Sequence, residues 1–239
     1  MAKYQISGDR VIDLSQTIEP NIPRPVGFPE PEMHLFKELH KDNSVVNVET
    51  WTFCPHAAGT HIDAPYHFIE GTATIDEMDP AVIIGSAVVV DMRHKKDKDF
   101  GIEKSDVQEW EQKTGETIRE GDAVLFMTDF SRFWGLGEQA QKDFLDQPWP
   151  YITRSVADYL LEKKVRLVGV ESMDLDFIDP YNLPAAEFIG HRTFLGNGIY
   201  IIENLKNLDK IGKTRCDIVA TPLKLKGGTG SPVRVLAFV

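Results

Sequence analysis

Apolar residues in this chain gather in short runs that either alternate with polar positions or stay continuously apolar, as β-strands do. Aliphatic residues and Phe recur in these runs. The pattern predicts strands at residues 11–14, 45–53, 87–92, 123–127, 165–170, 199–202, 217–225 and 233–239. Because the runs are spread over the whole length, we expect a sheet assembled from distant parts of the chain.

Helical patterns are shorter and lie at residues 106–114, 152–164 and 185–195. Ser105 and Gln108 have the spacing of a capping box at the start of the first segment. The second segment places apolar side chains three or four positions apart and ends in lysines, which favour a helix C-terminus. Gly196 closes the third. Strands outnumber helices and the two kinds are interspersed, so the predicted class is α/β with one core.

The composition fits a single globular domain over residues 1–239. Hydrophobic residues make up 42% and charged residues 26% of the chain, which leaves enough apolar material for a core. Lys and Arg number 26 against 37 Asp and Glu, so the net charge is −11. Such a surface repels nucleic-acid phosphates and anionic lipid, and the one dense basic patch, at residues 94–98, is interrupted by an aspartate. We therefore expect neither nucleic acid nor a membrane as a partner.

Two further features of the sequence concern location and shape. Cys54 and Cys216 are too few for a disulfide framework, which fits a reducing compartment. The first ten residues lack the apolar core of a signal peptide, so we expect a cytoplasmic protein. Residues 20–31 contain five prolines and are predicted to form an extended arm laid on a surface.

The densest candidate chemistry lies in residues 54–68. His56, His61, Asp63 and His67 fall within twelve positions of one another. In an extended segment residues two apart share a face, so His61 and Asp63 can point at one centre. Imidazole nitrogen and carboxylate oxygen suit a borderline divalent metal such as zinc or manganese. The competing interpretation is an ordinary polar loop, and further ligands downstream would decide between the two.

Two such candidates follow further along the chain. His191 lies in the third predicted helix, and Glu203 follows the predicted strand at 199–202. The turn between them contains Gly196 and Gly198, so a helix-turn-strand unit can bring both side chains to one place. Taken singly, each is equally a helix-surface histidine or a solvated glutamate at a strand end.

At these residues the chain resembles the cyclase-type metal hydrolases, a family that includes bacterial kynurenine formamidase and isatin hydrolase. The family hallmark is His-x-Gly-Thr-His-x-Asp-x-Pro-x-His, and the matching residues are Gly59-Thr60-His61-Ile62-Asp63-Ala64-Pro65-Tyr66-His67. Other similar segments lie at residues 11–15, 121–125, 169–176, 222–225 and 231–234. The resemblance implies a β-rich swivelling β/β/α fold, a homo-oligomer, and a centre of one or two metal ions.

The resemblance also implies roles for individual residues. His61 and Asp63 match metal ligands, and Asp63 is the one that would bridge two ions. His191 and Glu203 match ligands of the second metal. His67 matches the catalytic acid–base histidine, and Glu203 is a second candidate for a catalytic role.

His56 departs from the hallmark, because the family places this histidine two residues before the glycine and Ala57 occupies that position here. An undistorted strand with one extra residue would send the His56 ring away from the centre. A β-bulge would restore its aim, so we predict that His56 is a ligand of the same metal as His61 and Asp63. Without such a distortion the site would lack one ligand.

The expected activity is hydrolysis of a non-peptide C–N bond in a small amide. A divalent ion lowers the pKa of water toward roughly 7, and His67 can take the proton of water and return it to the leaving nitrogen. N-formylkynurenine is the first candidate substrate, and isatin-like lactams are the alternative. A metal-assisted cyclase or dehydratase and a non-catalytic metal-binding relative are further alternatives. Asp129 and Asp174, which stand where the family often has Gly and Ser, leave the substrate open.

The cofactor and the assembly follow from the same reasoning. Zinc is the first choice of metal and manganese the second, at one or two ions per chain. The Pro-rich arm at residues 20–31 is rigid enough to reach across an interface at low entropic cost. We therefore expect a homodimer or a homotetramer.

Overall fold

The computed structural model describes residues 6–41, 43–95, 100–179 and 187–239. Its main element is one mixed sheet whose strands run in the order β1-β12-β11-β5-β7-β9-β10-β4. In this order the strands are Val11–Asp13, Gly230–Phe238, Arg215–Pro222, Ile84–Asp91, Ala123–Met127, Leu167–Val170, Tyr200–Glu203 and His61–Asp63. Since β4 pairs with both β10 and β12, the sheet closes on itself, and β1 lies outside the ring on β12. The predicted α/β class with one β-rich domain is confirmed.

The strands β5, β7, β9 and β10 run parallel to one another at the centre of the sheet. All five residues of β7 and all four of β9 are buried, because both faces of these strands are covered. On β7, Leu125 faces the inner core, while Val124 and Phe126 face the helices. These strands have continuous apolar sequences because both of their faces are buried.

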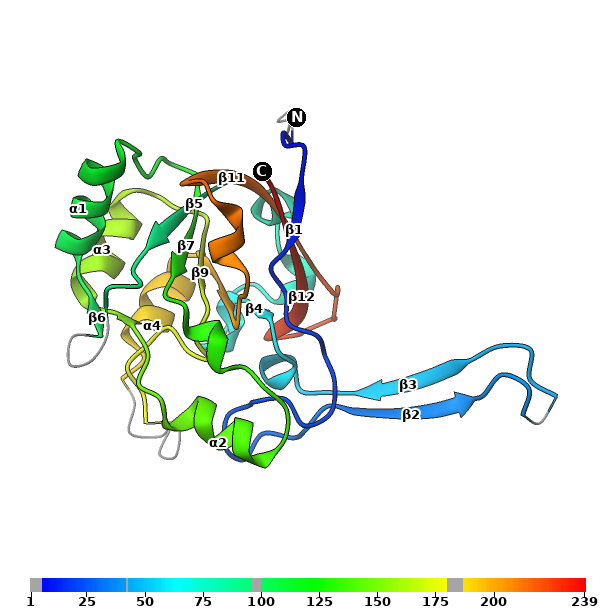
Figure 1. Cartoon of the computed structure of the whole chain (residues 1–239). Coiled ribbons are helices and arrows are strands. Elements are labelled where there is room, and N and C mark those ends of the chain that lie inside the picture. Colours follow the sequence, from blue (N-terminus) through cyan, green and yellow to red (C-terminus); the bar gives the residue numbers. More distant parts are fainter. Residues whose placement is uncertain (1–5, 42, 96–99, 180–186) are drawn as a thin grey trace.

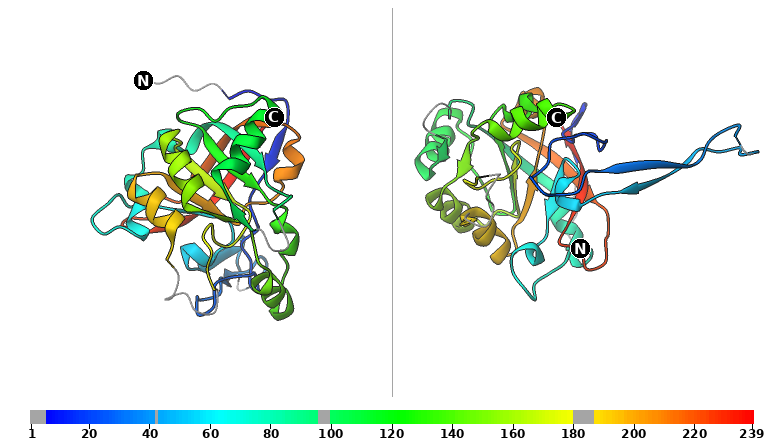
Figure 2. Two further views of the ribbon diagram at one scale, coloured as in Figure 1. Left: turned by 90° about the vertical axis from the view of Figure 1, so that its left-hand side faces the viewer. Right: turned by 90° about the horizontal axis from the view of Figure 1, so that it is seen from below.

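Helices cover the outer face of the parallel strands (Figures 1 and 2). They are α1 at Lys104–Thr114, α3 at Arg154–Glu162 and α4 at Ile189–Gly196. A fourth helix, α2 at Glu138–Asp146, packs with the aromatic residues Phe130 and Trp149 in a separate cluster. The short strands β6 at Gly101–Ile102 and β8 at Tyr151–Ile152 pair with each other. None of the helices in the described residues has the length and apolar character needed to cross a bilayer.

All three predicted helix starts differ from the structure, and the second helix, expected from residue 152, begins at Arg154. The capping box expected at Ser105 and Gln108 is wrong, because Glu103 caps α1 and its backbone N–H donates to the Asp106 carboxylate at 2.7 Å. The third helix was expected over 185–195, but α4 begins at Ile189, and residues 185 and 186 lie outside the described residues.

A hairpin of two strands, β2 at Glu32–Lys37 and β3 at Val48–Thr52, projects from the body of the molecule (Figures 1 and 2). Every residue in both strands is exposed. The Pro-rich segment at 20–31 precedes this hairpin and lies on the body, where Ile22 is fully buried and the Gly137 N–H donates to the Asn21 carbonyl at 2.8 Å. The element that reaches away from the body is therefore the hairpin.

Candidate active site

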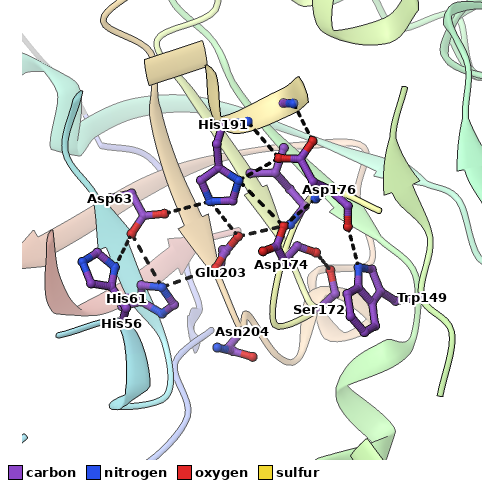
Figure 3. Close-up of polar contacts among 12 residues, drawn as sticks. His56, His61, Asp63, Trp149, Ser172, Asp174, Asp176, His191, Glu203 and Asn204 are labelled. Carbon is purple, nitrogen blue, oxygen red and sulfur yellow. Dashed lines mark hydrogen bonds and ion pairs between the residues drawn. The ribbon is translucent and has the colours of Figure 1, made fainter. Parts of the chain in front are cut away.

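The short strand β4 places two candidate ligands side by side where the sheet closes. His61 and Asp63 are 2% and 1% exposed, and Ile62 between them packs into the inner core. Glu203 at the end of β10 pairs with His61 across the sheet. His61 Nε2 lies 3.6 Å from Asp63 Oδ1 and 3.4 Å from Glu203 Oε2 (Figure 3). His61 and Asp63 therefore share a face, as expected, and Glu203 lies next to them.

The turn before β4 fixes which ring nitrogen of His61 faces the centre. Gly59 has a φ of 75°, which side chains other than Gly rarely adopt. Its carbonyl oxygen lies 3.0 Å from His61 Nδ1. A carbonyl only accepts, so Nδ1 carries a proton, and Nε2 is the nitrogen that faces the two carboxylates.

A reciprocal pair of hydrogen bonds ties this turn to the end of β10. The Thr60 hydroxyl donates to the Asn204 carbonyl at 2.7 Å, and Asn204 Nδ2 donates to the Gly59 carbonyl at 3.3 Å. Thr60 and Asn204 are the direct neighbours of His61 and Glu203. The two bonds therefore hold these two side chains in a fixed relation, a function that the sequence pattern did not reveal.

His191 reaches the centre from α4. Its Nδ1 donates to Asp176 Oδ2 at 2.8 Å, and the same oxygen accepts the His191 backbone N–H at 3.0 Å. Its Nε2 then lies 3.4 Å from Asp63 Oδ2 and 3.5 Å from Glu203 Oε1. Asp176 thus sets the orientation of His191, as carboxylates commonly do for histidine ligands.

Asp174 and Asp176 were not among the candidate ligands, although a sequence signal existed. Both follow the apolar run that forms β9, and polar residues after a parallel strand gather at its carboxyl end. Asp174 is buried, with Oδ1 3.7 Å from His191 Nδ1. Asp129, the other departure from the family pattern, is half-exposed and pairs with Arg132 at 2.7 Å.

The ring of His56 lies at the same centre despite the extra residue. Its Nδ1 is 2.8 Å from Asp63 Oδ1. The extra residue is absorbed by a 3-10 turn at Pro55–Ala57, so the expectation of a β-bulge is wrong. Pro55 occupies the first position of this turn, where its fixed φ favours helical geometry.

His67 lies against His56 with the two rings stacked at 3.9 Å and 12°. It closes a second 3-10 turn, Pro65–His67, and a ring nitrogen comes within 4.8 Å of ligand atoms of Asp63 and His191. Burial, with a smaller opposing effect from Asp63, lowers the pKa of His67 from 6.5 to about 3. The imidazole is therefore neutral at pH 7.

The cluster holds more buried carboxylate than the side chains around it neutralise. Four acids, Asp63, Asp174, Asp176 and Glu203, are at most 8% exposed. Within the described part of the chain, the ion pairs of these four acids are all with histidines. Buried charge of this kind is stable only when it is paired or bound to a metal.

The pKa directions within the cluster reflect this excess. Burial raises the pKa of Glu203 and of Asp174 well above the usual carboxyl range. Burial also favours neutral His191, yet Asp174 and Asp176 outweigh it and raise the pKa of His191 well above 6.5. For Asp63 the imidazoles of His191 and His56 outweigh burial and hold its pKa well below 3.8.

One buried oxygen of the cluster is free to bind a cation. Asp63 Oδ2 is buried and makes no hydrogen bond. Imidazole nitrogens and carboxylate oxygens around it form the donor set that zinc and manganese accept. His61, Asp63, His191 and Glu203, with His56 beside them, therefore fit one or two divalent cations.

Aromatic side chains border the cluster on the α4 side. The rings of Phe68 and Phe188 lie 4.6 Å and 5.7 Å from the His191 ring. A cavity of about 450 Å³ is lined by Asp176 and Phe188, which neighbour His191, and by Tyr151 and Phe177, whereas the candidate metal ligands are not among its lining residues. Two other aromatic residues lie away from the cluster: Phe130 packs in a separate aromatic core and Trp51 lies on the hairpin.

Comparison with known proteins gives a consistent set of similarities. The family model Cyclase, described as "Putative cyclase", matches residues 12–177. Kynurenine formamidase from Bacillus cereus is 29% identical over 94% of this chain and 95% of its own. The structure of isatin hydrolase A from Ralstonia solanacearum superposes with a TM-score of 0.82 at 31% identity, over 95% of this chain and 91% of that one. A predicted metal-dependent hydrolase from Bacillus stearothermophilus gives 0.71 at 29% identity, over 95% and 97%.

Proposed function

The chain belongs to the Cyclase family, and from this premise we propose that it is a metal-dependent hydrolase that cleaves the C–N bond of a small amide. The observation that carries the proposal is a neutral His67 beside a buried carboxylate oxygen, Asp63 Oδ2, that has no hydrogen-bond partner. His67 can transfer a proton, and Asp63 Oδ2 can bind a cation. Relatives described as hydrolases support the same reaction class.

Some side chains of the site would bind the metal, and another would transfer the proton. His61, Asp63, His191 and Glu203 would hold the metal, with zinc the first choice and manganese the second. A bound divalent ion would polarise the amide carbonyl and lower the pKa of water toward roughly 7. His67 takes a proton from the attacking water as its oxygen bonds to the carbonyl carbon. His67 then returns that proton to the leaving nitrogen as the C–N bond breaks.

An aromatic amide is the substrate class that we propose first. Tyr151, Phe177 and Phe188 line the cavity beside Asp176, and such side chains favour a planar aromatic ring. N-formylkynurenine is the lead candidate because one relative is described as a kynurenine formamidase. An isatin-like lactam is the second candidate, supported by the likeness to isatin hydrolase A.

Metal analysis combined with a hydrolysis screen tests this proposal. Purified protein should contain zinc or manganese and should hydrolyse an aryl formamide or a lactam in preference to lactones. Labelled water should place its oxygen in the acid product, whereas a cyclase or dehydratase would not consume water. Protein with a full complement of metal and no turnover on any amide would instead favour a non-catalytic metal-binding relative.

We further propose that the hairpin β2–β3 makes the protein a homo-oligomer. Met33 and Trp51 pair across the hairpin, with Leu35 on the same face, and all three side chains are at least 40% exposed. A two-stranded hairpin is marginally stable alone in water, so this apolar face needs a covering surface. A second copy offers an identical amphipathic hairpin related by two-fold symmetry.

Sedimentation at micromolar concentration is expected to show a species of at least twice the 27.0 kDa chain mass. Leu35→Lys should shift the protein toward the monomer, because it buries a charge in the proposed interface. His34→Lys, which places the same charge on the opposite face of the strand, is the control and should leave the oligomer unchanged. A wild-type protein that sediments only as a monomer would contradict the proposal.

A further inference from the structure

We propose that Thr229 and Gly230 form a cradle that lets the displaced His56 bind metal through Nδ1, whereas His61 and His191 use Nε2. The inference rests on the proposed metal binding and adds the positioning residues and the ligand atom. Thr229 and Gly230 lie where β12 begins, next to β4. The sequence pattern assigns neither of them a role.

Gly230 provides the space that the His56 ring occupies. A Cβ atom at this position would lie 2.6 Å from His56 Cε1 and 2.7 Å from the Ile62 carbonyl oxygen. Both distances are far below van der Waals contact, so any side chain would displace the ring or the neighbouring strand. Gly230 also pairs with Asp63 in the register between β12 and β4. The ring is thus held directly over the strand that carries Asp63.

Thr229 holds the opposite edge of the same ring. Its hydroxyl oxygen lies 2.8 Å from His56 Nε2, and His56 Nδ1 lies 2.8 Å from Asp63 Oδ1. A carboxylate only accepts hydrogen bonds, but a threonine hydroxyl donates or accepts by rotating about its C–O bond. The ring can therefore carry its proton on either nitrogen without moving.

This freedom decides whether His56 can be a ligand. With the proton on Nδ1, His56 donates to Asp63 and the Thr229 hydroxyl donates to Nε2. With the proton on Nε2, the Thr229 hydroxyl accepts it, and the Nδ1 lone pair faces the centre beside Asp63. The two neutral forms hold the same number of protons, so a cation can select the second form without ionising the ring.

The other two histidines have no such freedom. The Nδ1 atom of His61 faces the Gly59 carbonyl, and that of His191 faces the Asp176 carboxylate. Both partners are acceptors, so the proton stays on Nδ1 and Nε2 faces the centre. His56 lies in a 3-10 turn, and its Nε2 atom, not its Nδ1 atom, faces the supporting group, the Thr229 hydroxyl. The ligand atom therefore differs as a result of the extra residue before Gly59.

The test uses ¹¹³Cd²⁺ as the metal and protein labelled with ¹⁵N in histidine. Scalar coupling to ¹¹³Cd should appear at Nδ1 of His56 and at Nε2 of His61, with His56→Gln identifying the first signal. Coupling at Nε2 of His56, or none at all from this ring, would overturn the inference. Absence of Cd²⁺ uptake by the wild-type protein would overturn the proposed function as well, so the two failures are distinguishable.

Substitutions at Thr229 test the cradle by a second measurement. Thr229→Val keeps the shape and removes the hydroxyl, and Thr229→Ser keeps the hydroxyl as the matched control. We expect Thr229→Val to weaken Cd²⁺ binding by roughly 10- to 100-fold, the usual effect of losing a group that orients a ligand. Thr229→Ser should bind as the wild type does, and both metal-free variants should remain folded by circular dichroism. Equal affinities in the valine and serine variants would refute the role of the hydroxyl.

Discussion

Asp63→Asn is expected to leave the purified protein almost free of metal. Asp63 lies against His56, His61 and His191, and its Oδ2 atom has no hydrogen-bond partner. The amide that replaces it is a poorer ligand and brings N–H donors into a centre where a cation should sit. The loss of affinity should exceed the roughly 100-fold reached by changes to groups outside the ligand set.

Metal content measured by elemental analysis, together with circular dichroism to verify folding, checks this result. Asp129→Asn is the matched control, because the Asp129 carboxylate is half-exposed and pairs with Arg132. This control should retain its metal. A folded Asp63→Asn protein with full metal stoichiometry would remove Asp63 from the ligand set.

His67→Ala is expected to lower kcat by roughly 10²- to 10⁴-fold, the typical contribution of a positioned acid–base group. The neutral imidazole of His67 is close enough to Asp63 and His191 to serve a reaction at that centre. The metal should remain bound, because His61, Asp63, His191 and Glu203 are unchanged. Steady-state kinetics and metal analysis on the same preparation measure both quantities.

Two further variants separate proton transfer from packing. His67→Phe keeps a flat ring against His56, so it should lose activity as the alanine variant does while preserving the stack. His94→Ala removes an exposed histidine and should change nothing. Near-normal turnover in either His67 variant, or wholesale loss of metal, would show that His67 has another role.

The sequence predicted best those elements whose residues are buried on both sides. The run at 123–127 became β7 with the same bounds, because nothing but apolar side chains fits between two cores. β2 was missed because its residues are all exposed and mix charged with apolar types. β4 has no apolar run, because two of its three residues are candidate ligands, but the extended conformation expected for His61 and Asp63 is confirmed.

The contacts that sequence reasoning missed at the site are those between distant parts of the chain. His56 and Thr229 are separated by 173 positions, and no local pattern shows that they meet. The orientation of His191 by Asp176 likewise depends on how α4 packs after β9. Residue type and short-range spacing could identify which side chains carry the chemistry, whereas their supporting partners depend on the closure of the sheet.

Because β4 closes the sheet, metal binding should also affect the lifetime of the protein. β4, a strand of three residues, joins β10 to β12, and the side chains proposed to hold the ion lie on β4 itself, on β10, on α4 and in the turn before β4. An ion that binds only the closed form adds about 2.7 kcal/mol of stability when its free concentration is 100 times its Kd. Metal supply would then regulate abundance as well as activity. In a metal-starved cell β4 would separate from β10 and β12 more often, and proteases would degrade the metal-free protein before the metal-bound protein.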